Sequence, residues 1–140
     1  MSANNRIVSI VDDDPDTTMF FQEALRTIAG ITIFTFTDPI LALEHFQDKG
    51  YAYVAVISDF KMPGLNGMEF LKKIKESNRF VRTILMTAFT IDDKLFREYT
   101  KKKIINGFLQ KPIGIHDLII EVNTQLDSYE VQKKYPSSML

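Results

Sequence analysis

Acidic side chains stand at the ends of two apolar segments of this sequence. Asp12 and Asp13 follow the segment IVSIV, and Asp59 follows YVAVIS. A carboxylate beside apolar residues is costly to bury unless it is paired or bound to a metal ion. Two later apolar segments, RTILMT and IINGFLQ, end in Thr87 and precede Lys111, respectively. A hydroxyl group and an ammonium group could therefore join the three acids in one site.

These residue types suit phosphoryl transfer. Three close carboxylates repel one another, and a hard divalent cation would relieve that repulsion. Mg²⁺ takes oxygen ligands and keeps several waters, so it can hold phosphoryl oxygens as well as protein oxygens. Lys111 could contact the same oxygens as a point charge, and Thr87 could donate a hydrogen bond to one of them. An aspartate in such a site can act as a nucleophile and form an acyl phosphate.

The five side chains can meet only if the preceding segments are parallel strands of one sheet. Short apolar segments alternate with segments that have apolar residues at helical spacing, and we expect strands at 7–11, 31–36, 53–58, 82–87 and 104–110. This alternation predicts an α/β fold with helices on both faces of a parallel sheet. Sites in such sheets form at the carboxyl ends of the strands, which is where these side chains fall.

Capping residues mark several of the expected helices. Asp14 and Asp38 each precede a proline, which is the N-cap followed by a preferred first helical residue. Asn66 lies three residues before Glu69, which is capping-box spacing. We expect further helices from about 90 to 102 and from about 114 to 127. Segment 31–36, with its interleaved threonines, favours an edge strand.

Length and composition indicate one ordinary globular domain. The chain has 140 residues and a net charge of −1, which gives no electrostatic reason to expect binding to nucleic acid or to an anionic membrane. It has no cysteine, no apolar stretch of signal-peptide type and none of membrane-spanning length. We expect a cytoplasmic protein with a domain over 1–127, a short C-terminal tail over 128–140 that extends the last helix or frays, and no output domain.

Four motifs carry a resemblance to a known family. The segments IVDDDP, ISDFKMPGLNG, ILMTA and GFLQKPI, in this order and spacing, closely resemble the receiver domain of two-component response regulators, in its stand-alone, CheY-like form. The resemblance covers about residues 5 to 127. It implies a flavodoxin-like, doubly wound fold with a five-stranded parallel sheet in the order 2-1-3-4-5.

The resemblance also implies a role for each site residue. Asp59 matches the phosphoacceptor. Asp12 and Asp13 match the acidic pair that binds Mg²⁺, Asp13 directly and Asp12 largely through water. The main-chain carbonyl of Lys61 matches a further metal ligand.

Other matches concern the response to phosphorylation. Thr87 matches the switch hydroxyl that meets the phosphoryl group, and Phe108 matches the aromatic residue that turns inward when it does. Lys111 matches the site lysine, followed by Pro112 in a turn whose peptide bond is usually cis. We expect Ile91, Lys94, Tyr99 and Ile120 to lie on the surface that then changes.

Two residues are predicted to flank the acyl phosphate. Phe89 would exclude or fail to orient the attacking water, and Lys61 would pair with a phosphoryl oxygen. Both effects predict slow self-dephosphorylation. The alternative is that Phe89 points to solvent and binds a partner.

Some residues are assigned a structural role. Phe20 and Phe21 are expected in the core, and His45 and His116 on the surface. The segment KKKIING departs from the family, which commonly has small residues there. Its lysines, 101 to 103, are interpreted as solvating a helix end, with docking of an acidic partner as the alternative.

The predicted function is that of a single-domain response regulator. A histidine kinase or histidine phosphotransfer protein would phosphorylate Asp59, and the altered surface would bind a downstream protein or form a phosphorylation-dependent dimer. We expect no enzyme in the ordinary sense. One alternative is a Mg²⁺-dependent aspartyl-phosphate phosphatase, although Lys61 stands where such enzymes usually carry a second acid. The other is a phosphorylation-independent adaptor, which would lack the acids or the lysine.

Overall fold

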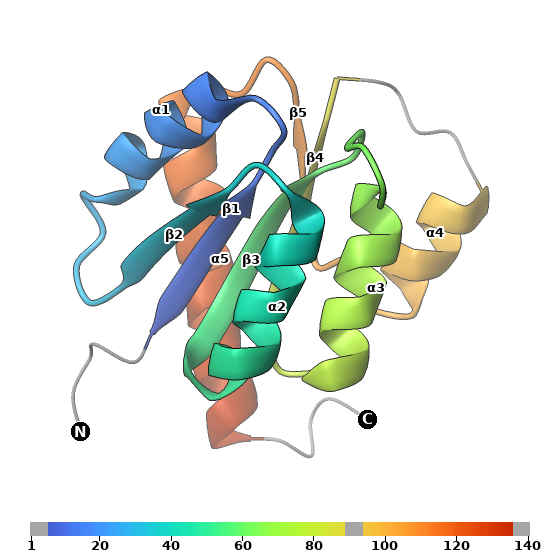
Figure 1. The fold of residues 1–140 in the computed structure, drawn as a ribbon. Coiled ribbons are helices and arrows are strands. Elements are labelled where there is room, and N and C mark those ends of the chain that lie inside the picture. Colours follow the sequence, from blue (N-terminus) through green and yellow to red (C-terminus); the bar gives the residue numbers. More distant parts are fainter. Residues whose placement is uncertain (1–5, 89–93, 136–140) are drawn as a thin grey trace.

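One parallel sheet organises the chain. The computed structural model describes residues 6–88 and 94–135. Within them the strands lie in the order β2-β1-β3-β4-β5, all parallel, which confirms the predicted fold class and order (Figure 1). The strands are β1 (Ile7–Val11), β2 (Thr32–Phe36), β3 (Tyr53–Asp59), β4 (Arg82–Thr87) and β5 (Gly107–Gln110). β2 is an edge strand, as its threonines indicate.

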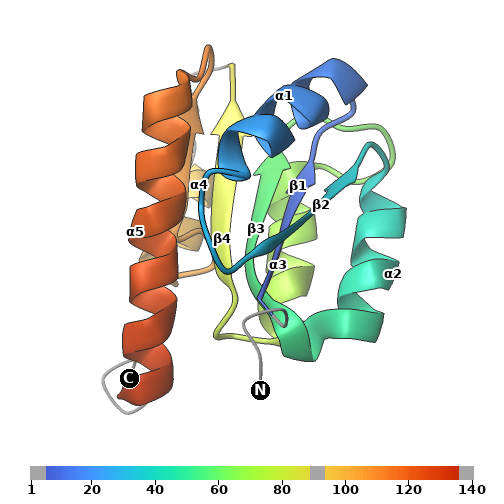
Figure 2. The same ribbon diagram turned by 90° about the vertical axis from the view of Figure 1, so that its left-hand side faces the viewer.

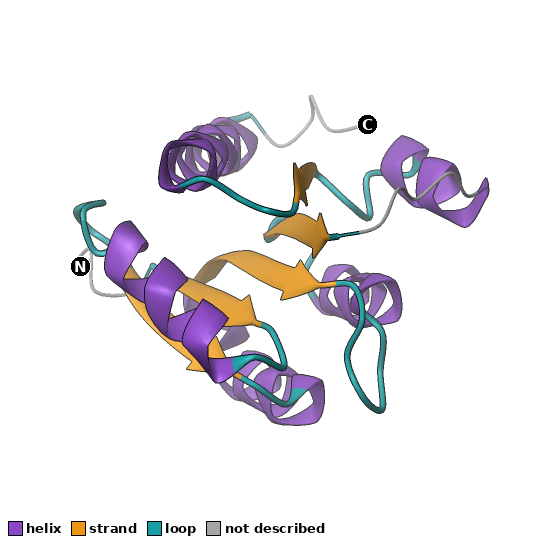
Figure 3. Ribbon diagram, turned by 90° about the horizontal axis from the view of Figure 1, so that it is seen from above, coloured by secondary structure: helices purple, strands orange, loops and turns teal. Residues whose placement is uncertain are grey.

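Helices cover both faces of the sheet. They are α1 (Pro15–Leu25), α2 (Pro39–Lys49), α3 (Gly67–Ser77), α4 (Lys94–Lys101) and α5 (Ile115–Lys134), and a short 3₁₀ helix lies at Gly50–Ala52. α1 and α5 pack on one face, while α2, α3 and α4 pack on the other (Figures 2 and 3). None of the helices within the described ranges combines the length and the apolar composition needed to cross a membrane.

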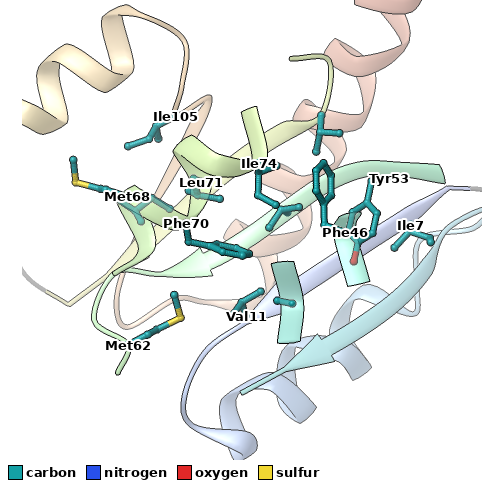
Figure 4. Packing of buried hydrophobic residues seen from close by; sticks show 14 of the residues in the cluster. Ile7, Val11, Phe46, Tyr53, Met62, Met68, Phe70, Leu71, Ile74 and Ile105 are labelled. Atoms are coloured by element: carbon teal, nitrogen blue, oxygen red, sulfur yellow. The ribbon is translucent and has the colours of Figure 1, made fainter. Parts of the chain in front are cut away.

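Each face has its own apolar core. Figure 4 shows the side chains beneath α2 and α3, where Phe46, Phe70 and Ile74 pack against the sheet. Val11 and Tyr53 complete this layer from the strands. All five are at most 2 % exposed. Since both faces of β1 and β3 are covered, their sequences are apolar without alternation.

The expected caps begin three helices. Asp14 and Asp38 each accept a hydrogen bond from the backbone N–H two residues later, at 3.0 and 2.8 Å. The side chain of Asn66 accepts one from the backbone N–H of Glu69 at 2.9 Å. The carboxylate of Glu69 accepts a hydrogen bond from the hydroxyl group of Tyr99 at 3.0 Å. It thereby ties α3 to α4.

Two assignments of apolar and aromatic residues were wrong. Phe21 is buried, but Phe20 is 52 % exposed, because the core-facing stripe of α1 passes through only one of these neighbours. His116 is exposed, whereas His45 is half-buried. The ring of His45 packs against Phe34, and its Nδ1 lies 2.6 Å from the hydroxyl oxygen of Tyr53.

The segment KKKIING ends α4 and shortens the fifth strand. β5 begins at Gly107 rather than at 104, because the preceding residues form a hydrogen-bonded turn. The side-chain oxygen of Asn106 accepts from the backbone N–H of Thr83 at 3.0 Å, and the Thr83 hydroxyl donates to the carbonyl of Ile104 at 2.6 Å. Lys103 has a positive φ of 62°. Polar contacts therefore hold the turn between α4 and β5.

The last helix extends into the C-terminal tail, which is one of the two predicted alternatives. α5 continues through Lys134, so residues 128–134 extend it rather than fray. Tyr129 packs against the core on this face, and Gln132 is only 8 % exposed.

Candidate functional site

The carboxyl edge of the sheet brings the three acids together. Asp12 follows β1 and Asp59 ends the neighbouring strand β3, whose Ser58 pairs with Val11. One carboxylate oxygen of each of Asp12, Asp13 and Asp59 lies within 4.8 Å of the others. Asp12 and Asp59 are 1 % and 8 % exposed, while Asp13 is exposed. The cluster is thus buried on two sides and open on the third.

Lys111 reaches the cluster from beyond β5. Its Nζ lies 3.1 Å from Oδ2 of Asp12 and 3.1 Å from Oδ1 of Asp59. The backbone N–H of Lys111 donates to the carbonyl of Thr87 at 2.8 Å, which fixes the lysine beside the end of β4. The peptide bond to Pro112 is cis, as expected from the resemblance.

Burial and charge perturb the titration of this group of residues. Burial, and then the nearby charge of Asp12, raise the pKa of Asp59, although Lys111 opposes the shift. Burial alone would lower the pKa of Lys111, but hydrogen bonds and charge from Asp12 and Asp59 raise it overall. The ammonium group therefore stays charged at neutral pH, in contact with two of the three clustered acids. The remaining repulsion would favour a bound cation.

The backbone around the acids is held closely. A carboxylate oxygen of Asp12 accepts from the backbone N–H of Asp14 at 3.0 Å. The backbone N–H of Gly67 donates to the carbonyl of Phe60 at 2.7 Å. A Cβ at position 67 would clash with the carbonyl oxygen of Asp59. Sequence reasoning did not single out Gly67, whose signal is a glycine directly after the Asn66 cap.

The two residues matched to the switch lie where the sequence predicts. Thr87 ends β4 and is 1 % exposed, with its carbonyl bonded to Lys111. Phe108 is 36 % exposed, and its ring packs edge-on against Phe96 with centroids 5.3 Å apart. Phe108 is thus in an outward position.

The predicted output surface needs one correction. Lys94 and Ile120 are exposed, but Tyr99 is only 4 % exposed. It is buried because its hydroxyl group donates to Glu69 beneath α4. Ile91 lies outside the described residues.

Of the two residues predicted to flank the acyl phosphate, Lys61 and Phe89, the structure describes only Lys61. Lys61 is exposed and lines a hollow of about 440 Å³ together with Asp13. The role of its carbonyl as a metal ligand stays a prediction. Phe89 lies outside the described residues, so the expected effect on lifetime also stays a prediction.

The donor set fits one class of metal ion. The cluster of Asp12, Asp13 and Asp59 offers only carboxylate oxygens, and hard cations such as Mg²⁺ prefer such ligands. The exposed side at Asp13 leaves room for water or for a phosphoryl group. A carboxylate at 8 % exposure, beside a fixed ammonium group, is also a suitable nucleophile for phosphorus.

Comparison with known proteins identifies the family of this chain. The model of the response regulator receiver domain matches residues 8–123. The DNA-binding transcriptional regulator NtrC of Escherichia coli K12 is 30 % identical over 128 residues, which is 91 % of this chain but 26 % of that protein. The chain thus spans about a quarter of this curated relative.

Solved structures share the fold. A protein of Neptuniibacter caesariensis has a TM-score of 0.82 at 26 % identity, covering 94 % of this chain and 95 % of that one. A response regulator receiver domain protein of Clostridium thermocellum has a TM-score of 0.78 at 24 % identity, covering 90 % and 98 % of the two chains. With the family match over most of its length and the acidic cluster at the expected edge, this chain belongs to the response regulator receiver domain family.

Proposed function

We propose that this receiver domain accepts a phosphoryl group on Asp59 from a histidine kinase or a histidine phosphotransfer protein. The observation that carries the proposal is the position of Lys111, whose Nζ lies 3.1 Å from both Asp12 and Asp59. This contact joins the end of β5 to the ends of β1 and β3. It puts a fixed positive charge beside the acid that would receive the phosphoryl group.

The chemistry requires little covalent work from other residues. A carboxylate oxygen of Asp59 attacks the phosphorus of a phosphohistidine. The bond from phosphorus to the histidine nitrogen breaks, and that nitrogen takes a proton from solvent. Lys111 and the hydroxyl group of Thr87 stabilise the charge on the phosphoryl oxygens. Mg²⁺, held by Asp12, Asp13, Asp59 and the carbonyl of Lys61, would supply further positive charge for the same oxygens.

Phosphorylation would act through the face formed by α4, β5 and α5. We expect Thr87 to meet the phosphoryl group and Phe108 to turn inward from its exposed position against Phe96. Leu95, Phe108 and Ile120 are exposed apolar side chains on these three elements. A change in their arrangement would favour a state that binds a downstream protein or a second copy of the chain. Phosphorylation would shift the equilibrium between existing conformations, so the unphosphorylated protein should already sample that state.

The test is phosphorylation of an Asp59→Asn variant. After exposure to acetyl phosphate and Mg²⁺, Phos-tag electrophoresis should show a retarded, hydroxylamine-labile band for the wild type and none for Asp59→Asn. Asp14→Asn is the matched control, because Asp14 is an exposed N-cap whose side chain points to its own helix. This control should be phosphorylated normally. Labelling of Asp59→Asn at the wild-type rate would refute the assignment.

A phosphatase is the main competing function. It would require turnover of small phosphate esters rather than storage of one phosphoryl group. The exposed Lys61 two residues after Asp59 gives no acid for that chemistry. Catalytic release of phosphate from such esters by the wild type, lost in Asp59→Asn, would favour the enzyme instead.

A further inference from the structure

A polar cavity lies at the amino-terminal ends of the strands, opposite the acidic cluster at their carboxyl ends. It forms where β4 and β5 begin, beside the ends of α3 and α5 and the turn after α4. Its volume is about 350 Å³. Six of its ten lining residues are cations, namely Lys72, Lys75, Arg79, Arg82, Lys102 and Lys103. We refer to this site as the basic cavity.

The composition of the chain does not account for this charge. The protein has 17 basic and 18 acidic residues, yet a third of the basic ones line this cavity. Glu76 is the one acid among the lining residues. Within the described residues, the ion pair of Lys102 with Glu98, at 3.0 Å, is the one formed by any of the six cations. The basic cavity therefore keeps a large excess of positive charge.

Specific contacts hold two of the cations at its wall. The Nε of Arg82 donates to the side-chain oxygen of Gln125 at 2.8 Å, and the Nζ of Lys75 donates to the carbonyl of Arg79 at 3.1 Å. Burial, together with the charge of Arg82, lowers the pKa of Lys75 to about 7. Like charges gathered in a partly buried place are unfavourable, and a bound anion would relieve them.

A buried amide gives independent support for a ligand. Gln132 lines the basic cavity from α5 and is only 8 % exposed. Among the residues that the structure describes, its buried side-chain Nε2 has no hydrogen-bond partner. An unsatisfied buried donor is costly, and such a group in a native structure calls for a missing acceptor. An oxygen of a ligand in the basic cavity would be that acceptor.

We propose that the basic cavity binds a small molecule carrying two or more phosphate-type negative charges. The volume lies within the range of sites for small ligands. Side chains from α3, β4, α5 and the turn after α4 converge on it, so it is a concave site rather than the extended basic stripe typical of nucleic-acid binding. The lining residues include no aromatic side chain, so recognition rests on charge and hydrogen bonds.

The site also has room for an uncharged part of such a ligand. A neighbouring hollow of about 510 Å³ shares Arg82 and Gln132 with the basic cavity. It adds Asp127 and Ser128, which can bond to hydroxyl groups. A phosphorylated compound with a polar, hydroxyl-bearing portion fits this pair of hollows.

Inorganic pyrophosphate is a suitable probe, titrated without Mg²⁺ into the isotope-labelled full chain. At ~0.15 M salt, where screening acts over about 8 Å, weak surface attraction is suppressed. We expect saturable NMR shifts of the side-chain amide of Gln132 and of the backbone amides of Arg82 and Asn106. By calorimetry, Arg82→Gln and Lys75→Gln should each weaken binding at least about tenfold. Lys73→Gln, an exposed residue of the same helix outside the lining, should change it less than about twofold.

A Gln132→Leu variant separates binding from folding. It removes the unsatisfied donor, so its melting temperature should equal or exceed that of the wild type, while its affinity for pyrophosphate falls. Unchanged affinity in this variant would overturn the assignment of Gln132. The proposed site would be overturned by any of three results. These are no saturable NMR shifts, an equal loss of affinity in all three charge variants, or shifts confined to Asp59 and Lys111. Tighter binding of a short single-stranded DNA at the same residues would overturn the choice of a small molecule.

Discussion

Two lysines of this chain are held in opposite ways by their surroundings. Lys111 contacts Asp12 and Asp59, and these acids raise its pKa against the effect of burial. Lys75 is half-buried beside Arg82, and its pKa falls to about 7. The charged form of the first lysine is stabilised by its neighbours, whereas the charged form of the second is destabilised. A residue that lowers stability in this way is typical of a functional position.

The cost of Lys75 should be visible in stability as a function of pH. Because its folded pKa lies below its ordinary value of 10.5, the folded state binds fewer protons than the unfolded state between about pH 7 and 10.5. The stability contribution therefore rises with pH across this window. Lys75→Met should stabilise the protein by about 1 kcal/mol at pH 6 to 7, after allowing for solvent screening, and the gain should shrink towards pH 10.

Denaturant unfolding at several pH values measures this difference. Lys73→Met, at an exposed position on the same helix, should show no comparable pH dependence. A destabilised Lys75→Met at neutral pH would mean that the bond from Lys75 to the carbonyl of Arg79 outweighs the cost of its charge.

Among the elements, α4 has an unusual end. Lys103 adopts a φ of 62°, in the left-handed region that glycine favours after a helix. The backbone N–H of Ile104 then donates to the carbonyl of Tyr99 at 2.8 Å, which closes the helix. A lysine at this position is strained, and it also lines the basic cavity.

Replacing this residue by glycine should stabilise the fold. Lys103→Gly relieves the backbone strain and should raise the free energy of unfolding by about 0.5–1 kcal/mol. Lys101→Gly is the matched control, since it removes the same charge from the last residue of α4 and should instead destabilise by up to about 1 kcal/mol. Chemical denaturation of both variants decides the question. Loss of stability in Lys103→Gly would show that contacts of the lysine side chain outweigh the strain.

The elements show what could be predicted from sequence. Local signals predicted these elements correctly. They are the continuous apolar segments that form strands and the helix N-caps Asp14, Asp38 and Asn66. Burial of Tyr99 depends on a bond to Glu69, thirty residues away, which no local pattern indicates. The start of β5 likewise depends on Asn106 bonding to β4.

The basic cavity was missed for the same reason. Its residues come from α3, β4, α5 and the segments between elements and are spread from 72 to 132, so only the lysines at 101–103 were noticed. They were assigned to solvating a helix end. One signal was available in α3, because Lys72 and Lys75 lie three residues apart on one face of the helix, and Arg79 follows soon after its end. The acidic cluster could be predicted because each acid ends a strand or lies within two residues of its end.

For the molecule as a whole, binding of Mg²⁺ should stabilise the folded state. The ion would bind the gathered carboxylates of the native protein but not the unfolded chain. At a free concentration about 100 times its Kd, linkage adds about 2.7 kcal/mol. For a domain of this size each 1 kcal/mol corresponds to roughly 3–4 °C in melting temperature. Thermal melts with and without Mg²⁺ measure the shift, and Asp13→Ala should lose most of it. An equal shift in that variant would place the ion elsewhere.

The two edges of the sheet also have a consequence for how this protein meets other molecules. The acidic cluster lies at the end of β4 that Thr87 occupies, and the basic cavity at the end that Arg82 occupies. Five steps along a strand separate them by roughly 17 Å. A net charge of −1 therefore conceals an acidic cluster and a basic cavity at opposite ends of the strands. An approaching acidic surface would turn the molecule so that its basic edge leads, and a basic surface would draw the phosphoacceptor edge forward, before any contact is made.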